Sequence, residues 1–397
     1  MIKAVLLDLD DTLIRTDTVA FTQRYLEKLG HSLREELAAP PDVIPRLVAL
    51  YKDIQATDNP GETLYERTVS GLAAITDSAP MSVEAAFARF YADVYPALCE
   101  SIQVEPAAVP LLERLFAAGY QVVIATNPAL PIEAIQQRMA AGCIPAYPFA
   151  LITSMQTMHF GKPDPAYYEE IRGLLEQRAA EMVMVGDDYH NDIQSAAAAG
   201  LHTYHLGPGG LAQFLEQVRA GWLDTLADAT RPDSVLLNRL RVFPAVVDSL
   251  KRTATAEMIQ RCPDVDEWSM RDVICHLRDY EVTQNQVHLK RVAAEDNPFI
   301  AADYVPWAGA FSYPDTPVDK AFAEFASHRA ETVAWLAAQP EEVWDRPARS
   351  SIFGPTTFRE LVHFITEHDR THYHQMRDAV DCAREAASTL RITPCPD

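Results

Sequence analysis

The chain has 397 residues, enough for about two to three domains that each bury a core. Its 56 acidic and 34 basic residues give a formal net charge of -22, which opposes binding to nucleic acid or to an anionic membrane surface. The six cysteines form no CxxC pair, and the sequence shows neither a leader nor a run of about 18 apolar residues. We therefore expect a soluble, cytoplasmic protein.

The first expected strand runs from Ile2 to Leu7 and is followed by three carboxylates, Asp8, Asp10 and Asp11. Ligands of open α/β sheets bind outside the carboxyl ends of the strands. Asp8 and Asp10 therefore lie where a cation and a phosphate could meet them. Taken alone, the stretch is also compatible with a simple acidic turn.

Residues 16–98 show helical patterns and no convincing strand, so this block can lie over the strand ends as a lid. Helices and strands alternate from residue 106 onward. The helices are expected at residues 106–119, 131–141, 164–178 and 191–200, and the strands at residues 120–125, 149–152, 181–185 and 201–206. This order predicts a parallel sheet covered by helices on both faces. We expect a core made of residues 1–15 and 99–226, with an all-α cap at residues 16–98.

A polar stretch at residues 227–234 is expected to be a linker, and no strand signals follow it. The rest of the chain shows four long helical segments, near residues 233–261, 269–294, 317–338 and 357–386. Two of them begin with capping boxes, formed by Ser269 with Asp272 and by Thr357 with Glu360. The pattern predicts an antiparallel, all-α four-helix bundle at residues 235–390.

Residues suited to phosphoryl chemistry follow the expected strands of the first part. Asp8 and Asp10 follow the first strand, Thr126 the second and Asp187 a later one, and Lys162 precedes a capped helix. Hydrolysis of a phosphate ester needs a nucleophile, a proton donor and neutralisation of charge. A carboxylate can be that nucleophile, and Mg²⁺ takes one or two carboxylates together with phosphate oxygens.

These segments resemble the four ordered motifs of the haloacid dehalogenase superfamily. The matching stretches are Asp8-Leu-Asp10-Asp-Thr12, Ala125-Thr126-Asn127, Gly161-Lys162-Pro163-Asp164-Pro165 and Gly186-Asp187-Asp188-Tyr-His-Asn-Asp192. The resemblance covers about residues 1–225. It implies a Rossmann-like core with a helical cap inserted after the first motif.

The resemblance also implies catalytic roles. Asp8 would be the nucleophile, and Asp10 would be the general acid and later the base that activates water. Thr126 and Lys162 would hold the phosphoryl oxygens.

A magnesium site follows from the same resemblance. Asp187 would bind Mg²⁺ together with the Asp8 carboxylate and the Asp10 backbone carbonyl. Asp192 would orient Lys162 or a water on the metal, and the sequence does not separate Asp192 from Asp188 in this role.

The acid at position 10 favours a phosphatase over a halide-displacing enzyme, because the leaving oxygen of a phosphate ester needs a proton. A closing lid favours small phosphorylated metabolites over macromolecules as substrates. The aromatic residues of the cap lie at helical spacing and are interpreted as core rather than as a substrate pocket: Tyr51, Tyr65, Phe87, Phe90, Tyr91 and Tyr95.

A second group of candidate residues lies in the expected bundle. His368 and His372 are four positions apart and share one face of a helix, which is the spacing of half a metal site. His276, on the second helix, is the third ligand if the two helices are neighbours. The alternative is that these histidines lie at the surface or at the edge of the core.

The surrounding stretches resemble the DinB-like four-helix bundle family. They are Trp268-Ser-Met-Arg-Asp272-Val-Ile-Cys-His276-Leu, Thr357-Phe-Arg-Glu-Leu and His368-Asp-Arg-Thr-His372-Tyr-His-Gln375, within about residues 232–386. The resemblance implies that His276, His368 and His372 bind a divalent metal such as nickel, zinc or iron. His363 and Cys275 fall outside the triad and are interpreted as structural.

The sequence thus predicts a magnesium phosphatase joined to a metal-binding bundle. One alternative makes the bundle a metal-dependent thiol transferase or isomerase, with the phosphatase-like part auxiliary. Another makes it a noncatalytic interaction module, through which the protein would form a homodimer.

Overall fold

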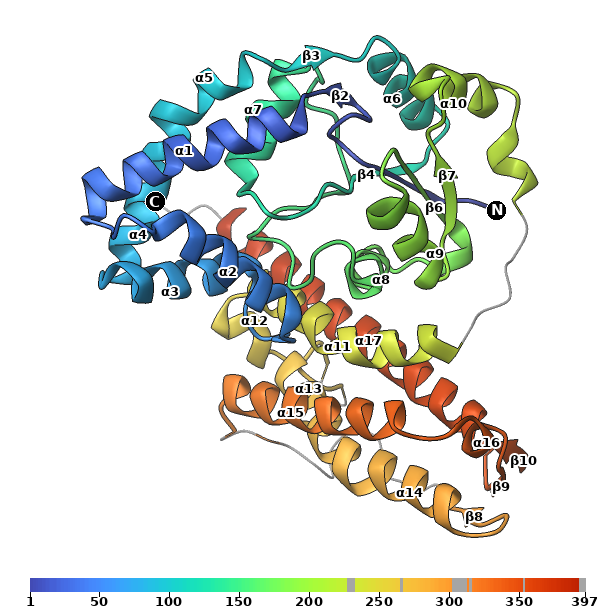
Figure 1. Cartoon of the computed structure of the whole chain (residues 1–397). Helices are drawn as coiled ribbons and strands as arrows, with labels where there is room; N and C mark the ends of the chain where they lie inside the picture. The colour runs from blue at the N-terminus through green and yellow to red at the C-terminus, as the bar shows by residue number, and fades with distance from the viewer. Residues whose placement is uncertain (227–232, 265–266, 302–312, 314–315, 353, 393–397) are drawn as a thin grey trace. The chain divides into compact units, whose positions relative to one another are not determined.

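The computed structural model describes residues 1–226, 233–264, 267–301, 313, 316–352 and 354–392 (Figure 1). The chain divides into two compact units, residues 1–231 and 232–397. Most of the expected linker, residues 227–232, lies outside the described residues.

The first unit is built on a five-stranded sheet in which every pair of neighbours is parallel. Its strands, in spatial order, are β5 (Leu151–Ile152), β4 (Gln121–Ile124), β1 (Ala4–Leu7), β6 (Met182–Gly186) and β7 (His202–His205). All four residues of the central strand β1 are buried, as expected of a parallel strand covered on both faces. The prediction of a parallel α/β core is confirmed.

Helices cover both sides of this sheet (Figure 1). They are α6 (Ala108–Ala117), α7 (Ile132–Ala141), α8 (Pro165–Leu175), η2 (Ala179–Glu181), η3 (Tyr189–Gln194), α9 (Ser195–Ala198), α10 (Gly210–Arg219) and η4 (Trp222–Thr225). Asp164 caps α8 by accepting a hydrogen bond from Ala166 N at 2.9 Å. The same helix ends three residues before the expected Arg178, because Glu176 adopts the left-handed conformation with φ 55°.

The segment between the first strand and α6 is helical, as the sequence predicts. It contains α1 (Thr18–Leu37), α2 (Val43–Ala56), α3 (Leu64–Thr76), α4 (Pro80–Arg89), η1 (Phe90–Val94) and α5 (Tyr95–Cys99). The short antiparallel pair β2 (Ile14–Arg15) and β3 (Gln103–Val104) joins its two ends. Phe87, Phe90, Tyr91 and Tyr95 are buried and make edge or tilted ring contacts with one another. These four are part of the core, as interpreted, but Phe87 and Tyr91 also line a cavity of about 330 Å³ together with the half-buried Tyr65.

The second unit is a helical bundle. Its helices are α11 (Asp233–Arg252), α12 (Ala256–Gln260), α13 (Met270–Tyr280), η5 (Glu281–Asn285), α14 (Gln286–Ala294), α15 (Val318–Ala337), α16 (Glu341–Trp344) and α17 (Phe358–Ile392). Helices α11 and α13 each pack against both α15 and α17. Both capping boxes form: Asp272 N donates to Ser269 Oγ and Glu360 N donates to Thr357 Oγ1.

The expectation that no strand follows residue 233 is wrong. A small sheet joins β8 (Phe299–Ile300), β9 (Pro347–Ser350) and β10 (Gly354–Thr357). These strands have two to four residues, too few for an alternating pattern to stand out, and they contain Pro347, Gly354 and Pro355, which are rare inside strands.

Within the described residues, no helix combines the length and the apolar character that crossing a bilayer requires.

Candidate active site and metal centre

The carboxyl ends of two neighbouring strands bring Asp8 and Asp187 together. Asp8 directly follows β1, and its backbone N–H donates to the carbonyl of Val185 in β6 at 3.0 Å. Asp187 follows β6, and one of its carboxylate oxygens accepts a hydrogen bond from Thr12 Oγ1 at 3.3 Å. Thr12 and Asp187, 175 positions apart in sequence, thus meet at one edge of the sheet.

Lys162 reaches the same point from the loop before α8. Its Nζ lies 2.7 Å from Asp8 Oδ1 and 2.5 Å from Asp192 Oδ1. All three side chains are almost fully buried. Burial by itself would lower the pKa of Lys162, but the neighbouring Asp8 and Asp192 hold it well above its usual value. Lys162 is therefore a fixed positive charge beside Asp8.

Three carboxylates gather at this point, and two of them, Asp8 and Asp192, contact the single ammonium group. Asp8, Asp187 and Asp192 each offer an oxygen, and these oxygens lie within 4.8 Å of one another. Burial raises the pKa of Asp8 and of Asp187, and burial raises the pKa of Asp192 to about 6. Three acids around one cation leave an excess of negative charge that a divalent cation would neutralise. The donor set fits a magnesium ion.

The contacts separate Asp192 from Asp188, which the sequence does not. Asp192 accepts a hydrogen bond from Lys162 and packs against Gly186, where an added Cβ would lie 2.1 Å from Asp192 Oδ2. Asp188 instead caps its own turn, because its carboxylate accepts hydrogen bonds from the backbone of His190 and Asn191. Of the two, Asp192 is the residue that holds Lys162.

Thr126 lies beside Asp8 at the end of the adjacent strand β4. Ala125 N donates to Leu7 O at 2.7 Å, which continues the pairing of β1 with β4 up to the site. The Thr126 carbonyl accepts hydrogen bonds from Thr153 Oγ1 at 2.7 Å and from Tyr167 OH at 2.9 Å. These bonds fix the backbone of Thr126, which is buried.

Asp10 has a partner that the sequence analysis missed. Its Oδ1 accepts a charge-assisted hydrogen bond from Nη2 of Arg138, a buried residue of α7. Burial lowers the pKa of Arg138 to about 10, so the guanidinium stays charged at neutral pH. The side chain of Asp10 is 28% exposed, and its carboxylate does not belong to the cluster of Asp8, Asp187 and Asp192.

A buried pair supports the loop that carries Lys162. The Glu170 carboxylate accepts hydrogen bonds from the backbone N–H groups of His159 and Phe160, and His159 Nδ1 lies 2.7 Å from Glu170 Oε1. The side chains of His159 and Glu170 are completely buried. The loop is thus held to α8 immediately before Lys162.

Helix α2 contacts the site from the helical insertion. Tyr51 OH lies 3.4 Å from Asn127 Oδ1, and Gln55 Nε2 donates to the carbonyl of Lys162 at 3.1 Å. Burial raises the pKa of Tyr51, so its hydroxyl remains protonated. Tyr51 therefore differs from the other cap aromatics, since it faces a motif loop.

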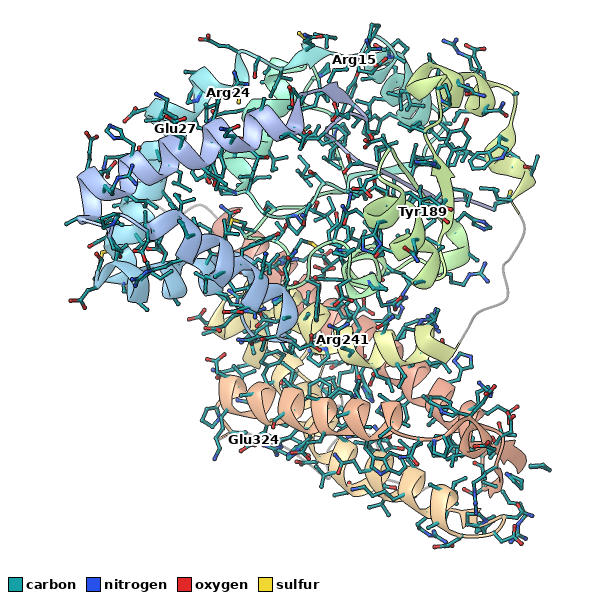
Figure 2. All side chains as sticks on the ribbon, in the orientation of Figure 1. Arg15, Arg24, Glu27, Tyr189, Arg241 and Glu324 are labelled. Atoms are coloured by element: carbon teal, nitrogen blue, oxygen red, sulfur yellow. The ribbon has the colours of Figure 1, made fainter. Side chains whose placement is uncertain are left out.

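Tyr189 lies two residues after Asp187, and its side chain is exposed (Figure 2). Its ring meets the ring of His205 edge-on at 5.7 Å. His205 Nε2 in turn lies 2.9 Å from the carbonyl of Asp187. The last strand, β7, thereby holds the backbone of Asp187 through this histidine, next to the hydrogen bond of 2.9 Å that Leu206 N donates to Gly186 O.

The second unit brings its three candidate histidines together. One ring nitrogen from each of His276, His368 and His372 lies within 4.8 Å of the other two. The Nε2 atoms of His368 and His372 are 3.1 Å apart. Burial lowers the pKa of all three imidazoles, that of His276 to about 3. Neutral imidazoles are the form that binds metals.

Aromatic rings enclose this histidine cluster. Tyr280 stacks on His368 with ring centroids 4.5 Å apart, and Trp268 lies 4.8 Å from His276. Gln375 Oε1 lies 2.9 Å from His372 Nδ1 and so fixes the orientation of that ring. The donor set and its support fit a divalent transition metal.

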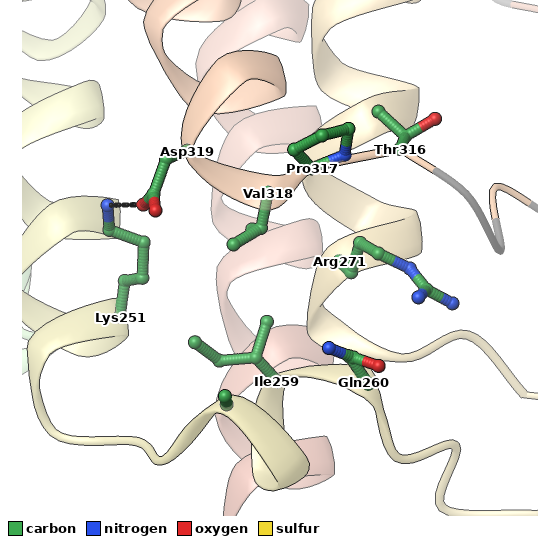
Figure 3. Close-up of a pocket in the computed structure, with 9 residues that line it drawn as sticks. Lys251, Ile259, Gln260, Arg271, Thr316, Pro317, Val318 and Asp319 are labelled. Carbon is green, nitrogen blue, oxygen red and sulfur yellow. Dashed lines mark hydrogen bonds and ion pairs between the residues drawn. The ribbon is translucent and has the colours of Figure 1, made fainter.

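Described residues of the second unit line at least two cavities. The first, of about 560 Å³, is lined by His276, one of the three clustered histidines, and by Tyr280. The second, of about 460 Å³, contains none of the three histidines; its walls include the ion pair of Lys251 and Asp319, 2.8 Å long (Figure 3). Of these two cavities, the first therefore borders the candidate metal centre through His276.

Comparison with known proteins agrees with this geometry. The family model of the haloacid dehalogenase-like hydrolases matches residues 2–200. The chain belongs to the haloacid dehalogenase-like hydrolases. The model of the DinB superfamily matches residues 236–376 of this hydrolase, which is the part that carries the three histidines.

Each of three individual relatives matches only part of this hydrolase. The acid sugar phosphatase of Staphylococcus epidermidis is 24% identical over 230 residues, which is 52% of this chain and 87% of that protein. A phosphatase of the same superfamily from Thermococcus onnurineus is 20% identical, with a TM-score of 0.36, and the match covers 57% of this chain and all of that one. YfiT from Bacillus subtilis, described as a probable metal-dependent hydrolase with a four-helix bundle, is 15% identical, with a TM-score of 0.35, and covers 41% of this chain and 91% of its own.

The hydrolase contains site residues that sequence reasoning missed, and Arg138 is the clearest. The buried face of α7 is formed by Ala134, Ile135, Arg138 and Met139. Helical periodicity alone would have placed this arginine among apolar residues, and a charge on an apolar face indicates a buried partner. Gln55 gave no such signal, because an isolated amide on a helix has no preferred partner.

Proposed function

We propose that the first unit is a magnesium-dependent phosphatase that hydrolyses small phosphorylated metabolites through an aspartyl-phosphate. The observation that carries this proposal is the convergence of Asp8, Lys162, Asp187 and Asp192 at the carboxyl edge of the sheet. A nucleophilic carboxylate, a fixed cation and a carboxylate cluster are the components that phosphoryl transfer requires.

The residues act in two steps in this proposal. An oxygen of Asp8 attacks phosphorus, the bond from phosphorus to the leaving oxygen breaks, and the Asp10 carboxyl group gives its proton to that oxygen. In the second step Asp10 takes a proton from water, which attacks the phosphoryl group and releases inorganic phosphate and free Asp8. Lys162 and Thr126 hold the phosphoryl oxygens throughout.

Mg²⁺, when bound, would neutralise the charge of the transferring phosphoryl group. Asp8, Asp187 and the Asp10 backbone carbonyl would hold it. Asp192 supports the same site indirectly, because its carboxylate keeps Lys162 beside Asp8.

The proposed substrates are small phosphate monoesters, with sugar phosphates first among them. Helix α2 approaches the motif loops through Tyr51 and Gln55, two uncharged polar side chains that hydrogen-bond well to hydroxyl groups. The similarity to an acid sugar phosphatase supports the same substrate class.

The first prediction is that the purified protein releases phosphate from members of a panel of sugar phosphates, nucleotides and short phosphorylated acids. Release should need Mg²⁺, stop when EDTA is added and resume when excess Mg²⁺ is restored. Phosphate is measured colorimetrically at each stage. Activity that survives exhaustive chelation would contradict the magnesium assignment, and no activity on any ester would contradict the phosphatase.

We further propose that the bundle binds one divalent transition metal, nickel, zinc or iron, through His276, His368 and His372. The observation that favours it is the approach of the three ring nitrogens to within 4.8 Å. His368 Nε2 faces the cluster, because it lies 3.1 Å from His372 Nε2, whereas His368 Nδ1 is buried without a hydrogen-bond partner among the described residues.

The second prediction concerns this metal. The purified wild type should carry about one equivalent of transition metal by elemental analysis. The double variant His276→Ala, His368→Ala should carry less than about a tenth of that, since a single remaining imidazole binds weakly. His363→Ala is the matched control, because His363 lies exposed on the same helix α17 and outside the cluster. Equal metal content in all three proteins would refute the site.

A further inference from the structure

Arg138 is an arginine in an apolar setting. Its side chain is 2% exposed, and the other buried residues of its helix, Ala134, Ile135 and Met139, are apolar or small. A buried guanidinium is unfavourable unless specific partners compensate for its lost hydration. The identity of those partners therefore indicates what the residue is for.

Arg138 has two such partners, and they come from different parts of the unit. Nη2 donates to Oδ1 of Asp10, in the loop after β1. The guanidinium carbon also lies 4.1 Å from the ring centroid of Phe21, a buried residue of helix α1 at the start of the helical insertion. Nε has no hydrogen-bond partner among the described residues, so the pair with Asp10 is the direct polar contact that compensates for burial. The charge of the nearby Asp8 acts in the same direction, because it raises the pKa of Arg138 against the effect of burial.

We propose that Arg138 is the positioning residue for Asp10 and that Phe21 links this position to the helical insertion. The inference rests on the proposed function, in which Asp10 transfers protons. Because Arg138 holds Oδ1, the other oxygen of Asp10 is left to face the leaving group. Because Phe21 lies on α1, a displacement of this helix would disturb the guanidinium and, through it, Asp10.

A purely structural ion pair would not distinguish between substrates, whereas a positioning role would. Esters with an alkyl leaving group need a proton on the departing oxygen, and nitrophenyl phosphate needs it much less, because nitrophenolate is a stable anion. Misplacing the proton donor should therefore slow the hydrolysis of a sugar phosphate far more than that of nitrophenyl phosphate.

The test compares kcat for a sugar phosphate and for 4-nitrophenyl phosphate in the full-length protein with Mg²⁺. Arg138→Met should lower kcat about 100-fold on the sugar phosphate and less than about tenfold on the nitrophenyl ester. Arg138→Lys keeps the charge but loses the planar guanidinium. It should therefore recover part of the kcat on the sugar phosphate that Arg138→Met loses. Phe21→Leu should show a smaller loss of the same kind, and these two variants carry the test if Arg138→Met does not fold.

Arg178→Met is the matched control. Arg178 also pairs with a carboxylate, Glu181, at 3.0 Å, but it lies before β6, at the opposite end of that strand from Asp187. Arg178→Met should change kcat by less than about twofold on both the sugar phosphate and 4-nitrophenyl phosphate, since exposed ion pairs contribute little to stability.

Asp10→Asn removes the proton donor itself and serves as the reference for its loss. The double variant Asp10→Asn, Arg138→Met then shows whether Arg138 acts through Asp10. If Arg138 acts through Asp10, adding Arg138→Met to Asp10→Asn should cause no further loss on the sugar phosphate. The inference would be overturned if the kcat losses of the two single variants multiplied in the double variant, or if Arg138→Met lowered kcat equally on both esters. Either result would leave the proposed phosphatase activity intact. A wild type inactive on both esters would overturn the proposed function and the inference together.

Discussion

Asp8→Asn should reduce magnesium-dependent phosphate release by on the order of a thousandfold or more. The amide has nearly the size and shape of the carboxylate, so packing is preserved, but it lacks the negative oxygen that attacks phosphorus. The variant also loses the ion pair with Lys162, whose ammonium group keeps its contact with Asp192. Steady-state phosphate release on the best ester of the panel measures the loss.

Asp188→Asn is the matched control for this substitution. Asp188 belongs to the same cluster of acids in the sequence, but its carboxylate caps the turn at His190 and Asn191 and does not contact Lys162. It should lose less than about tenfold in activity and about 1 kcal/mol of stability at most, the usual value of a cap. Circular dichroism must show both variants folded. Turnover by Asp8→Asn comparable to the wild type would remove Asp8 from the mechanism.

The convergence around Asp8 was predictable from sequence because the topology of a parallel sheet places the carboxyl ends of its strands at one edge. Lys162 lies 154 positions and Asp192 lies 184 positions after Asp8, yet each follows or precedes an element whose end lies at the same edge. Once the strands are recognised as parallel, their carboxyl ends must meet, whatever the intervening length. The same argument predicted Thr126 and Asp187.

The pairing of Asp10 with Arg138 was not predictable in this way. Arg138 lies inside helix α7, and the direction of its side chain depends on the rotation of that helix against the sheet. Its second contact, with Phe21, depends on how the insertion packs. These are tertiary facts that no local pattern specifies.

In the bundle, too, local features were predictable from sequence and tertiary contacts were not. Helical spacing predicted that His368 and His372 share a face, and capping boxes predicted where α13 and α17 begin. The short strands β8, β9 and β10 gave no periodic signal. The ionic network that accompanies the histidines also went unnoticed, because its three members are separated by 48 and 40 positions and follow no motif.

That network is centred on Arg329, whose side chain is 1% exposed. Its guanidinium donates to Asp369 at 2.5 and 3.0 Å and to Glu281 at 2.9 Å. Burial would raise the pKa of Glu281, but Arg329 holds it below its usual value. Burial, together with the charge of Glu281, raises the pKa of Asp369 to about 6 although Arg329 opposes this. Each carboxylate neighbours a residue of the metal centre: Asp369 follows His368, and Glu281 follows Tyr280, which stacks on His368.

Arg329→Met should therefore destabilise the bundle by about 3–5 kcal/mol, because it leaves buried carboxylates without their cation. The expected decrease in Tm is about 10 °C, measured by calorimetry on the full-length protein. Since the network orders the helices that carry His368, the variant should also lose bound metal. Arg370→Ala is the control: Arg370 lies on α17 next to Asp369, but its side chain is 58% exposed and pairs with Glu367, so the substitution should change stability by less than about 0.5 kcal/mol.

A triple variant separates charge from shape in this prediction. Combining Arg329→Met with Glu281→Gln and Asp369→Asn removes the cation and both anions together, so no buried charge is left unpaired. It should recover a large part of the lost stability, because replacing a whole buried ionic network costs much less than breaking one. If the triple variant is instead no more stable than Arg329→Met, the loss comes from packing against Phe325 and Phe243, whose rings lie 5.0 and 5.8 Å from the guanidinium carbon, and the electrostatic account of this core is wrong.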